Sequence, residues 1–242
     1  MDHTPDDHLL CWPPDAEPDR TPFVQLTLMP ERAAFEPESR TLFVADVHLG
    51  KAAVFRARGL PVPQGTTTAT LNRLSQALIR SQATRLVVLG DFLHARESHA
   101  TGTLAALSVW RDRHPKLDCR VVEGNHDLHA GRLHDTLGIQ LSAQPYAQGL
   151  LRGLHHPPVD EEQADWPNAL TLAGHIHPVV RLRGRTDTLR LPIFWLRRGV
   201  LTLPAFGEFT GGFEIRPTHP ADERLFVVSQ CVTPLTPLTP KN

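Results

Sequence analysis

The amino-acid sequence predicts an α/β protein with two sheets, on two observations. In the first half of the chain, short apolar segments alternate with longer segments of helical periodicity, which is typical of a parallel sheet with crossover helices. After about residue 138, short apolar segments separated by Pro, Gly and Arg turns predict a second, mostly antiparallel sheet that packs against or beside the first.

The chain has 242 residues, of which 40% are apolar, and this is enough to bury the core of one larger domain. Both ends are rich in proline and lack hydrophobic periodicity. We therefore expect a flexible N-terminal extension over residues 1–20, a single domain over 21–232 and a flexible C-terminal tail over 233–242.

The first half contains three expected strands and two expected helices. The strands lie at 41–46, 85–90 and 118–124, and the helices lie between them at 66–82 and 101–114. Threonines at the start of the first helix are expected to cap it. Because right-handed crossovers bring the carboxyl ends of parallel strands to one edge of a sheet, groups that follow these strands should meet in space. The leucines expected on the buried face of the first helix are Leu71, Leu74 and Leu78.

The second half contains seven short apolar segments that are expected to form strands. Its arginines alternate as exposed strand residues do, so they are interpreted as a polar sheet face. The expected strands are 150–156, 169–175, 178–184, 191–196, 199–206, 211–215 and 224–229. The arginines are Arg181, Arg183, Arg185, Arg197 and Arg198.

Composition excludes several classes of function. The 25 Lys and Arg against 26 Asp and Glu leave a net charge of −1, so a polyanionic partner must be held by a local patch or by bound metal. The three cysteines lie far apart without a C-x-x-C pair, which excludes a disulfide framework and a cysteine zinc site. No apolar run is long enough to span a bilayer, and we expect a cytoplasmic protein.

The 14 histidines are the unusual feature of the composition, because several lie beside Asp, Asn or Gly at the ends of expected strands. Any one such group is typical of an ordinary turn. Five groups together favour a metal site, since carboxylate oxygen and imidazole nitrogen suit Mn, Fe or Zn. They exceed the needs of one ion, which favours two metals about 3.5–4 Å apart that share a carboxylate. The groups are Asp46 and His48; Asp91 and His94; Asn125, His126 and Asp127; His155 and His156; and His175 and His177.

The motifs D-x-H, G-D-x-x-H, G-N-H-D, H-x-P and G-H-x-H, over residues 41 to 178, resemble those of the calcineurin-like metallophosphoesterase superfamily. Within it, "ADVHLGKAAVFRARGLPVPQGTT" and "LPAFGEFTGG" are similar to the bacterial ligase-associated DNA damage response metallophosphoesterase/endonuclease family. The motifs "DVHLG" and "GDFLH" also resemble those of the nuclease subunit in double-strand-break repair complexes. The chain departs from the serine/threonine protein phosphatases, which would show G-D-x-x-D-R-G and G-N-H-E.

The superfamily resemblance implies a β-sandwich with flanking helices in four layers, α/β/β/α, and a dinuclear metal site at the carboxyl ends of strands. It implies Asp46, His48 and His177 as ligands of one metal. Asn125, His155 and His175 would hold the other, with Asp91 as the bridging carboxylate. His156 is the alternative to His155, because the choice depends on strand register. His126 would be the general acid, His94 a second catalytic or phosphate-contacting imidazole, and Asp127 the residue that orients the turn.

The implied activity is hydrolysis of phosphodiester bonds, in DNA or nucleotides during DNA repair, with a metal-bridging hydroxide as nucleophile. The expected cofactors are two divalent ions, Mn first, with Fe and Zn as alternatives. By the same resemblance, a DNA ligase, a helicase and an exonuclease are expected functional partners. Two alternatives stay open: a small-molecule hydrolase of cyclic nucleotides or phosphomonoesters, and a non-catalytic scaffold. Retention of His126 and of every ligand counts against the scaffold.

Basic residues follow the first motif. Lys51, Arg56 and Arg58 could hold phosphate or DNA backbone, and a solvated basic turn is an equal alternative. The large aromatic residues are expected in the core rather than at a base-stacking surface, and Cys119 is expected as a small buried residue within a strand. These aromatic residues are Trp110 and Trp195.

Overall fold

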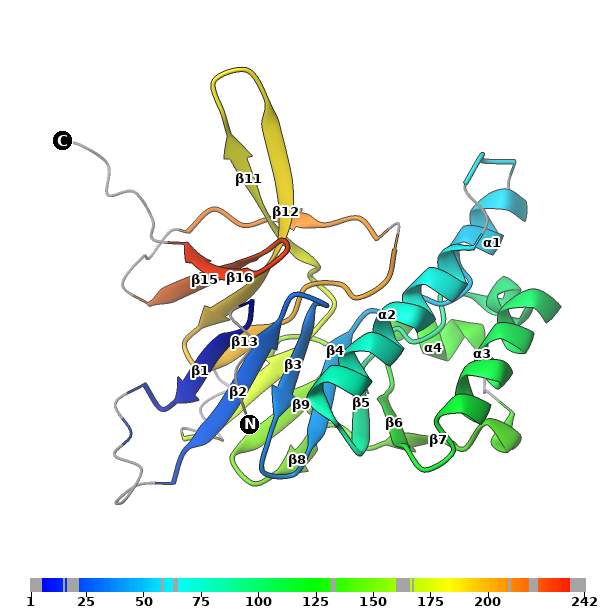
Figure 1. Ribbon diagram of the computed structural model, residues 1–242, viewed down its shortest axis with the longest axis horizontal. Coiled ribbons are helices and arrows are strands. Elements are labelled where there is room, and N and C mark those ends of the chain that lie inside the picture. The colour runs from blue at the N-terminus through cyan, green and yellow to red at the C-terminus, as the bar shows by residue number, and fades with distance from the viewer. Residues whose placement is uncertain are drawn as a thin grey trace.

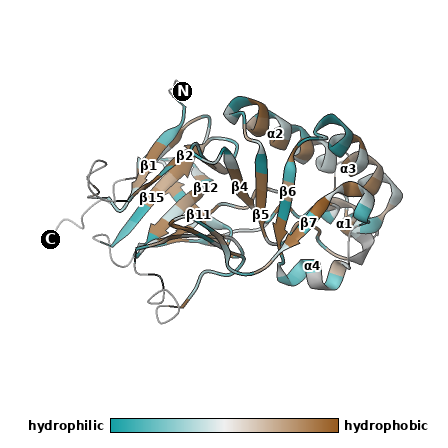
Figure 2. Ribbon diagram, turned by 90° about the horizontal axis from the view of Figure 1, so that it is seen from below, coloured by the Kyte–Doolittle hydropathy of each residue, from teal (hydrophilic) through white to brown (hydrophobic). Residues whose placement is uncertain are grey.

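The computed structural model describes residues 6–14, 16, 22–57, 59–62, 65–131, 134–159, 166, 168–208, 210–217 and 222–235. Two sheets pack against each other, and helices cover the other side of the first sheet (Figures 1 and 2). The predicted α/β fold class is confirmed.

The first sheet has seven strands whose spatial order equals their chain order. The first three pairings are antiparallel and the last three are parallel, so the carboxyl ends of β4, β5 and β6 lie side by side. The strands are β1 (His8–Trp12), β2 (Val24–Met29), β3 (Ala33–Glu36), β4 (Thr41–Ala45), β5 (Arg85–Leu89), β6 (Asp118–Val122) and β7 (Ile139–Ser142).

The described helices all belong to the first half of the chain. None of them is both long and apolar enough to cross a membrane. They are α1 (Lys51–Ala57), α2 (Thr66–Ser81), η1 (Arg96–His99), α3 (Thr101–Arg113), α4 (Asn125–Ala130) and η2 (Asp135–Leu137). Of these, α2 and α3 pack on the first sheet, where Leu74 and Leu107 are fully buried. The leucines expected on the inner face of α2 are buried, and Trp110 and Cys119 lie in the same core.

The start of α2 differs from the expectation. The cap is Gly65, with φ 84°, and no side-chain hydrogen bond caps the helix. The threonines are therefore helical residues rather than caps, because a glycine in the left-handed region already turns the chain into the helix without steric cost.

The second sheet is mostly antiparallel, as predicted, with five antiparallel and three parallel pairings. Strand β10 of this sheet is parallel to both β9 and β13, so the ends of β9 and β10 also lie side by side. The strands are β8 (Tyr146–Gln148), β9 (Leu151–Leu154), β10 (Leu170–Ala173), β11 (Pro178–Arg183), β12 (Thr188–Arg197), β13 (Val200–Thr202), β14 (Phe213–Glu214), β15 (Glu223–Val228) and β16 (Val232–Leu235).

Strand β4 shows how one sheet supports two cores. Leu42 and Val44 join the core under the helices, whereas Phe43 and Ala45 join the core between the sheets. The second core also contains Phe194 of β12. Side chains alternate across a strand, so an uninterrupted apolar run is what a strand buried on both faces requires.

One layer of the expected four is not found. In the part of the chain that the structure describes, every helix lies within residues 51–137, and none covers the outer face of the second sheet. That face instead carries a small apolar cluster that includes Val180, Ile193 and Leu225. The described architecture is therefore α/β/β.

The expected flexible extension over 1–20 is wrong for its middle part. Residues 8–12 form β1, which pairs with β2 at the edge of the first sheet, and Leu10 is buried in the core between the sheets. At the other end, β16 continues past residue 232 and pairs with β15. Strand β1 is not predicted from the sequence because it has only five residues and is flanked by Asp and Pro, so it shows no hydrophobic periodicity. Residues 1–5, 17–21 and 236–242 lie outside the described residues.

Candidate metal centre

The candidate ligands lie where parallel strands of both sheets end. Asp46 follows β4, Asp91 follows β5 and Asn125 follows β6, whereas His155 follows β9 and His175 follows β10. Backbone hydrogen bonds join the two sheets at this edge: the N–H of residue 206 donates to the carbonyl of residue 45 (2.8 Å), and that of residue 207 to residue 46 (3.0 Å). Side chains far apart in sequence therefore meet at one place.

The first cluster consists of Asp46, His48 and His177, with ligand atoms all within 4.8 Å of one another. Nε2 of His48 lies 3.3 Å from Nε2 of His177, which is 3.5 Å from Oδ1 of Asp46. Nδ1 of His177 donates to the carbonyl of Gly211 (3.3 Å), which leaves Nε2 with its lone pair. Oδ1 of Asp46 is buried without a hydrogen-bond partner. Lone pairs that converge without a donor fit a bound cation.

The second cluster is built around His155. Its Nδ1 donates to the carbonyl of Leu89 (3.2 Å), and its Nε2 lies 2.8 Å from Oδ1 of Asn125 and 3.2 Å from Nδ1 of His175. His155 is fully buried, whereas His156 is exposed, with its ring 3.8 Å from that of His175. The strand register thus turns His155 inward beside Asn125, where acceptor atoms again face one another and a cation fits.

Asp91 lies between the two clusters. Its Oδ2 is 3.7 Å from Nε2 of His48, and its Oδ1 is 3.5 Å from Nε2 of His155. The backbone N–H of His126 donates to Oδ1 (2.9 Å) and fixes the carboxylate. One carboxylate with an oxygen toward each cluster has the geometry of a bridging ligand.

Burial keeps the imidazoles of His48, His155 and His175 neutral. It lowers the pKa of His155 to about 4, against an opposing effect of Asp46, and it also lowers the pKa of His175. The pKa of His48 is lowered by burial first and then by nearby Lys51 and His177. Neutral imidazole is the form that binds metal. These residues can therefore bind a divalent cation near neutral pH without releasing protons.

The backbone is left-handed at most of the candidate ligands. Among the described residues, nine non-glycine residues have positive φ, and five of them are candidate ligands. Such conformations cost roughly 1–3 kcal/mol each and persist where the surrounding structure enforces them. They are Asp46 (53°), His48 (47°), Asp91 (48°), His175 (68°) and His177 (52°).

Glycines allow the strand ends to come this close. A Cβ on Gly90, where φ is +77°, would lie 2.0 Å from Nδ1 of His155, and a Cβ on Gly174 would lie 2.9 Å from Oδ2 of Asp46. A Cβ on Gly124 would lie 2.4 Å from Oδ1 of Asp91. The glycines of the G-D-x-x-H, G-N-H-D and G-H-x-H motifs are thus required by close packing against the ligands.

His126 and His94 form a pair at the opening of the site. Their rings stack with centroids 4.7 Å apart, and Nδ1 of His126 donates to the carbonyl of His94 (2.8 Å). Nε2 of His126 is 3.9 Å from Oδ2 of Asp91, and its side chain is 39% exposed. These two histidines and His48 also have ligand atoms within 4.8 Å of one another. The Nε2 atom of His126 is thus available to solvent, to a substrate or to a shared metal.

Asp127 holds the second and third motifs together. Its carboxylate accepts the backbone N–H groups of Leu93 (2.9 Å), Gly124 (3.1 Å) and Phe92 (3.2 Å). Burial raises its pKa to about 6, although these hydrogen bonds act in the opposite direction. These contacts are with the backbone of the second and third motifs, and the family resemblance implies an orienting role for Asp127.

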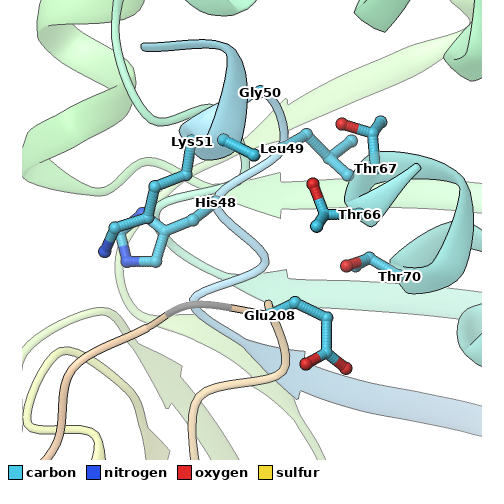
Figure 3. Close-up of a pocket in the computed structure, with 9 residues that line it drawn as sticks. His48, Leu49, Gly50, Lys51, Thr66, Thr67, Thr70 and Glu208 are labelled. Carbon is cyan, nitrogen blue, oxygen red and sulfur yellow. The ribbon is translucent and has the colours of Figure 1, made fainter. Parts of the chain in front are cut away.

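Lys51 lies beside the first cluster, at the start of α1. It lines a small pocket with His48, Thr66, Thr70 and Glu208 (Figure 3). Burial lowers its pKa, and the nearby carboxylates of Asp91 and Asp46 act against that effect.

Arg56 is exposed in the last turn of α1, about 7 Å farther along the helix axis than Lys51. The structure thus brings Lys51 to the site and leaves Arg56 at its periphery. Arg58 lies outside the described residues.

Two supporting contacts have no counterpart in the sequence prediction. Oγ of Ser98 is buried and accepts the N–H groups of His94 (3.2 Å) and Ala95 (3.1 Å). Arg73 of α2 donates to Glu208 and to the carbonyl of Phe206, which ties α2 to the segment beside Asp46. That segment belongs to the motif "LPAFGE", but its role in joining α2 to the site is seen only in the folded structure.

The chain is similar to one solved nuclease over nearly its whole length. It is 42% identical to the Pseudomonas putida nuclease MPE, with a TM-score of 0.75, and the match covers 88% of this chain and 96% of that one. The phosphoesterase YfcE from E. coli is a remote match, with 16% identity and a TM-score of 0.39, over 81% of this chain and 98% of that one. No protein-family model and no curated protein matches the chain.

A metal-binding cluster of carboxylates and neutral imidazoles at the edge of a β-sandwich, together with the nuclease match, defines a metal-dependent hydrolase of phosphate esters. The chain belongs to the calcineurin-like metallophosphoesterase family.

Proposed function

We propose that the protein is a two-metal phosphodiesterase that cleaves DNA. The observation that carries this proposal is the position of Asp91, which presents one oxygen to each of two clusters. Asp46, His48 and His177 would hold one ion, and Asn125, His155 and His175 the other. The mixed oxygen and nitrogen donors fit Mn, with Fe and Zn as alternatives. Ions bound there supply the charge that activates a water molecule and neutralises phosphate oxygens.

The chain itself supplies the proton for the leaving group. His126 donates through Nδ1 to the carbonyl of His94, so its Nε2 is the atom that can deliver a proton to a departing oxygen. His94 stacks on that ring and holds it in place. Lys51, beside the first cluster, is the residue placed to contact a phosphate oxygen.

DNA is favoured as substrate by the similarity to a nuclease and by the motifs shared with the ligase-associated DNA damage response family. We include in the proposal a role in DNA repair and an association with a DNA ligase, a helicase and an exonuclease. A cytoplasmic location is also part of the proposal, since the three cysteines are unpaired.

Elemental analysis of the protein saturated with Mn tests the metal count. We expect about two ions per chain, and about one after Asp91→Asn. A count near one in the wild type that Asp91→Asn leaves unchanged would exclude the bridging assignment.

A substrate panel at fixed Mn and salt tests the activity. Catalytic efficiency is compared on single-stranded DNA, duplex DNA, cyclic nucleotides and an aryl phosphate. We expect DNA cleavage that is lost in His126→Ala. Efficient turnover of a cyclic nucleotide or monoester without DNA cleavage would replace this proposal by the small-molecule hydrolase, and no turnover of any ester would support the scaffold.

A further inference from the structure

The β11–β12 hairpin projects from the body of the molecule (Figure 1) and begins immediately after His177. We propose that one face of this hairpin binds the phosphodiester backbone of a nucleic-acid strand whose scissile bond lies at the metal centre. This inference rests on the proposed function and adds a substrate-holding surface to it. The basic hairpin face is defined by Arg181, Arg183 and Arg190.

Strand geometry places the three arginines on one face. Arg181 and Arg183 are two residues apart on β11, and Arg190 of β12 is the direct partner of Arg181 in the antiparallel register. The neighbouring positions Leu182 and Leu191 pack toward the apolar cluster on the outer side of the second sheet. The arginines therefore point away from that cluster, and all three are exposed.

The charge of this face is not balanced within the described contacts. Arg181 and Arg190 lie directly opposite each other, an arrangement of like charges that destabilises a hairpin. Glu214 offsets it in part, through Arg181 (3.2 Å), but Glu214 is shared with Arg216 (3.1 Å). Because the whole chain is near neutral, a local excess of arginine is the arrangement that a polyanion recognises.

The basic hairpin face is continuous with the metal centre. Arg190 donates to the carbonyl of Gly212, and the adjacent carbonyl of Gly211 accepts from Nδ1 of His177. From His177 to Arg183 is six residues, or about 20 Å of strand. At about 3.4 Å of rise per nucleotide in B-form geometry, this distance corresponds to roughly six nucleotides. The face should therefore contact long strands and miss short ones.

Binding is measured by fluorescence anisotropy of a labelled single-stranded 20-mer, on Mn-loaded protein carrying His126→Ala so that the strand stays intact. Adding Arg181→Gln and Arg183→Gln should weaken binding roughly tenfold at ~0.1 M salt and reduce the slope of log K against log salt by about 1.4, because each phosphate contact on a single strand contributes about 0.7. The pair Arg181→Lys and Arg183→Lys should keep the slope, since it keeps the charge.

The matched control is Arg113→Gln with Lys116→Gln. Both residues are exposed and precede β6, at the edge of the sheet opposite the metal centre. Replacing them removes two positive charges, as the hairpin glutamine pair does. In the wild-type background, the hairpin variants should turn over bis(4-nitrophenyl) phosphate normally. Their defect on DNA should be small for a tetranucleotide and full for a 12-mer.

The outcomes separate the two proposals. If the intact hairpin binds and cleaves DNA, and the glutamine pair leaves affinity, salt slope and length dependence unchanged, the hairpin inference is wrong and the proposed function stands. Equal losses in the control pair also contradict the inference, because they indicate general charge attraction. If the protein with an intact hairpin binds no DNA while the aryl ester is hydrolysed, both the DNA substrate and the hairpin inference are wrong.

Discussion

Among single residues, His126 has the most specific expected effect on catalysis. We expect His126→Ala to retain both metals and to lose roughly a hundredfold or more in diester hydrolysis, because a positioned general acid contributes about that much. The loss should be smaller for an aryl ester, whose leaving group needs little protonation. Steady-state rates on both substrates, with metal content, test this.

His134→Ala is the matched control, since His134 is exposed and its side chain contacts Thr136. It should have wild-type rates. Loss of a metal in His126→Ala would instead assign His126 to the group that it forms with His48 and His94.

The chemistry of the site could be predicted at this scale, but its geometry could not. Paired Asp, His and Asn at strand ends indicate a metal centre because parallel strands end at one edge. The choice of His155 over His156 as the inner residue, and the role of Ser98 beneath His94, depend on how strands and loops pack. No local pattern marks the left-handed backbone at the ligands.

At the scale of secondary-structure elements, the turn between β5 and Asp91 is the most sensitive to added volume. Gly90→Ala places a methyl group against His155 and forces a non-glycine residue to φ +77°. We expect a loss of at least about 3 kcal/mol in unfolding free energy and reduced metal binding. Denaturant unfolding and metal analysis measure the two effects.

Gly59→Ala separates backbone strain from crowding. Gly59 has φ +78°, but a Cβ there would meet nothing within 4 Å. Its cost should be about 1–2 kcal/mol, the strain alone. If Gly90→Ala and Gly59→Ala lose the same unfolding free energy, the requirement for glycine at position 90 comes from backbone strain and not from packing against His155.

Elements with a strong hydrophobic pattern are predictable, and short or edge elements are not. The helix α2 is recognised by its leucines, and β4 by its apolar run. The seven-residue α1 and the six-residue α4 lack a period long enough to detect, and β1 is hidden by its polar flanks. The basic hairpin face could not be predicted without the strand register, because only the pairing of β11 with β12 places Arg190 opposite Arg181.

For the whole molecule, metal binding should stabilise both sheets together, since the clusters combine residues from both. Mn at about a hundredfold over its dissociation constant adds roughly 2.7 kcal/mol, which corresponds to a rise of about 5–11 °C in Tm for a protein of this size. Thermal unfolding followed by circular dichroism, with and without Mn, tests this prediction.

EDTA should reverse the rise, and Asp91→Asn should reduce it. A Tm that Mn leaves unchanged in the wild type would contradict a metal site shared between the sheets.

The strands of the first sheet lie side by side in the order in which they occur in the chain, and this order allows the sheet to form during synthesis. As a nascent chain leaves the ribosome, each strand from β1 to β7 can pair with the one made just before it, without waiting for distant sequence. A chain released up to that point contains Asp46, Asp91 and Asn125, whereas His155, His175 and His177 are still to be translated. A chain truncated after β7 therefore lacks three of the seven proposed ligands, and we expect it to bind metal only after the second sheet has been made.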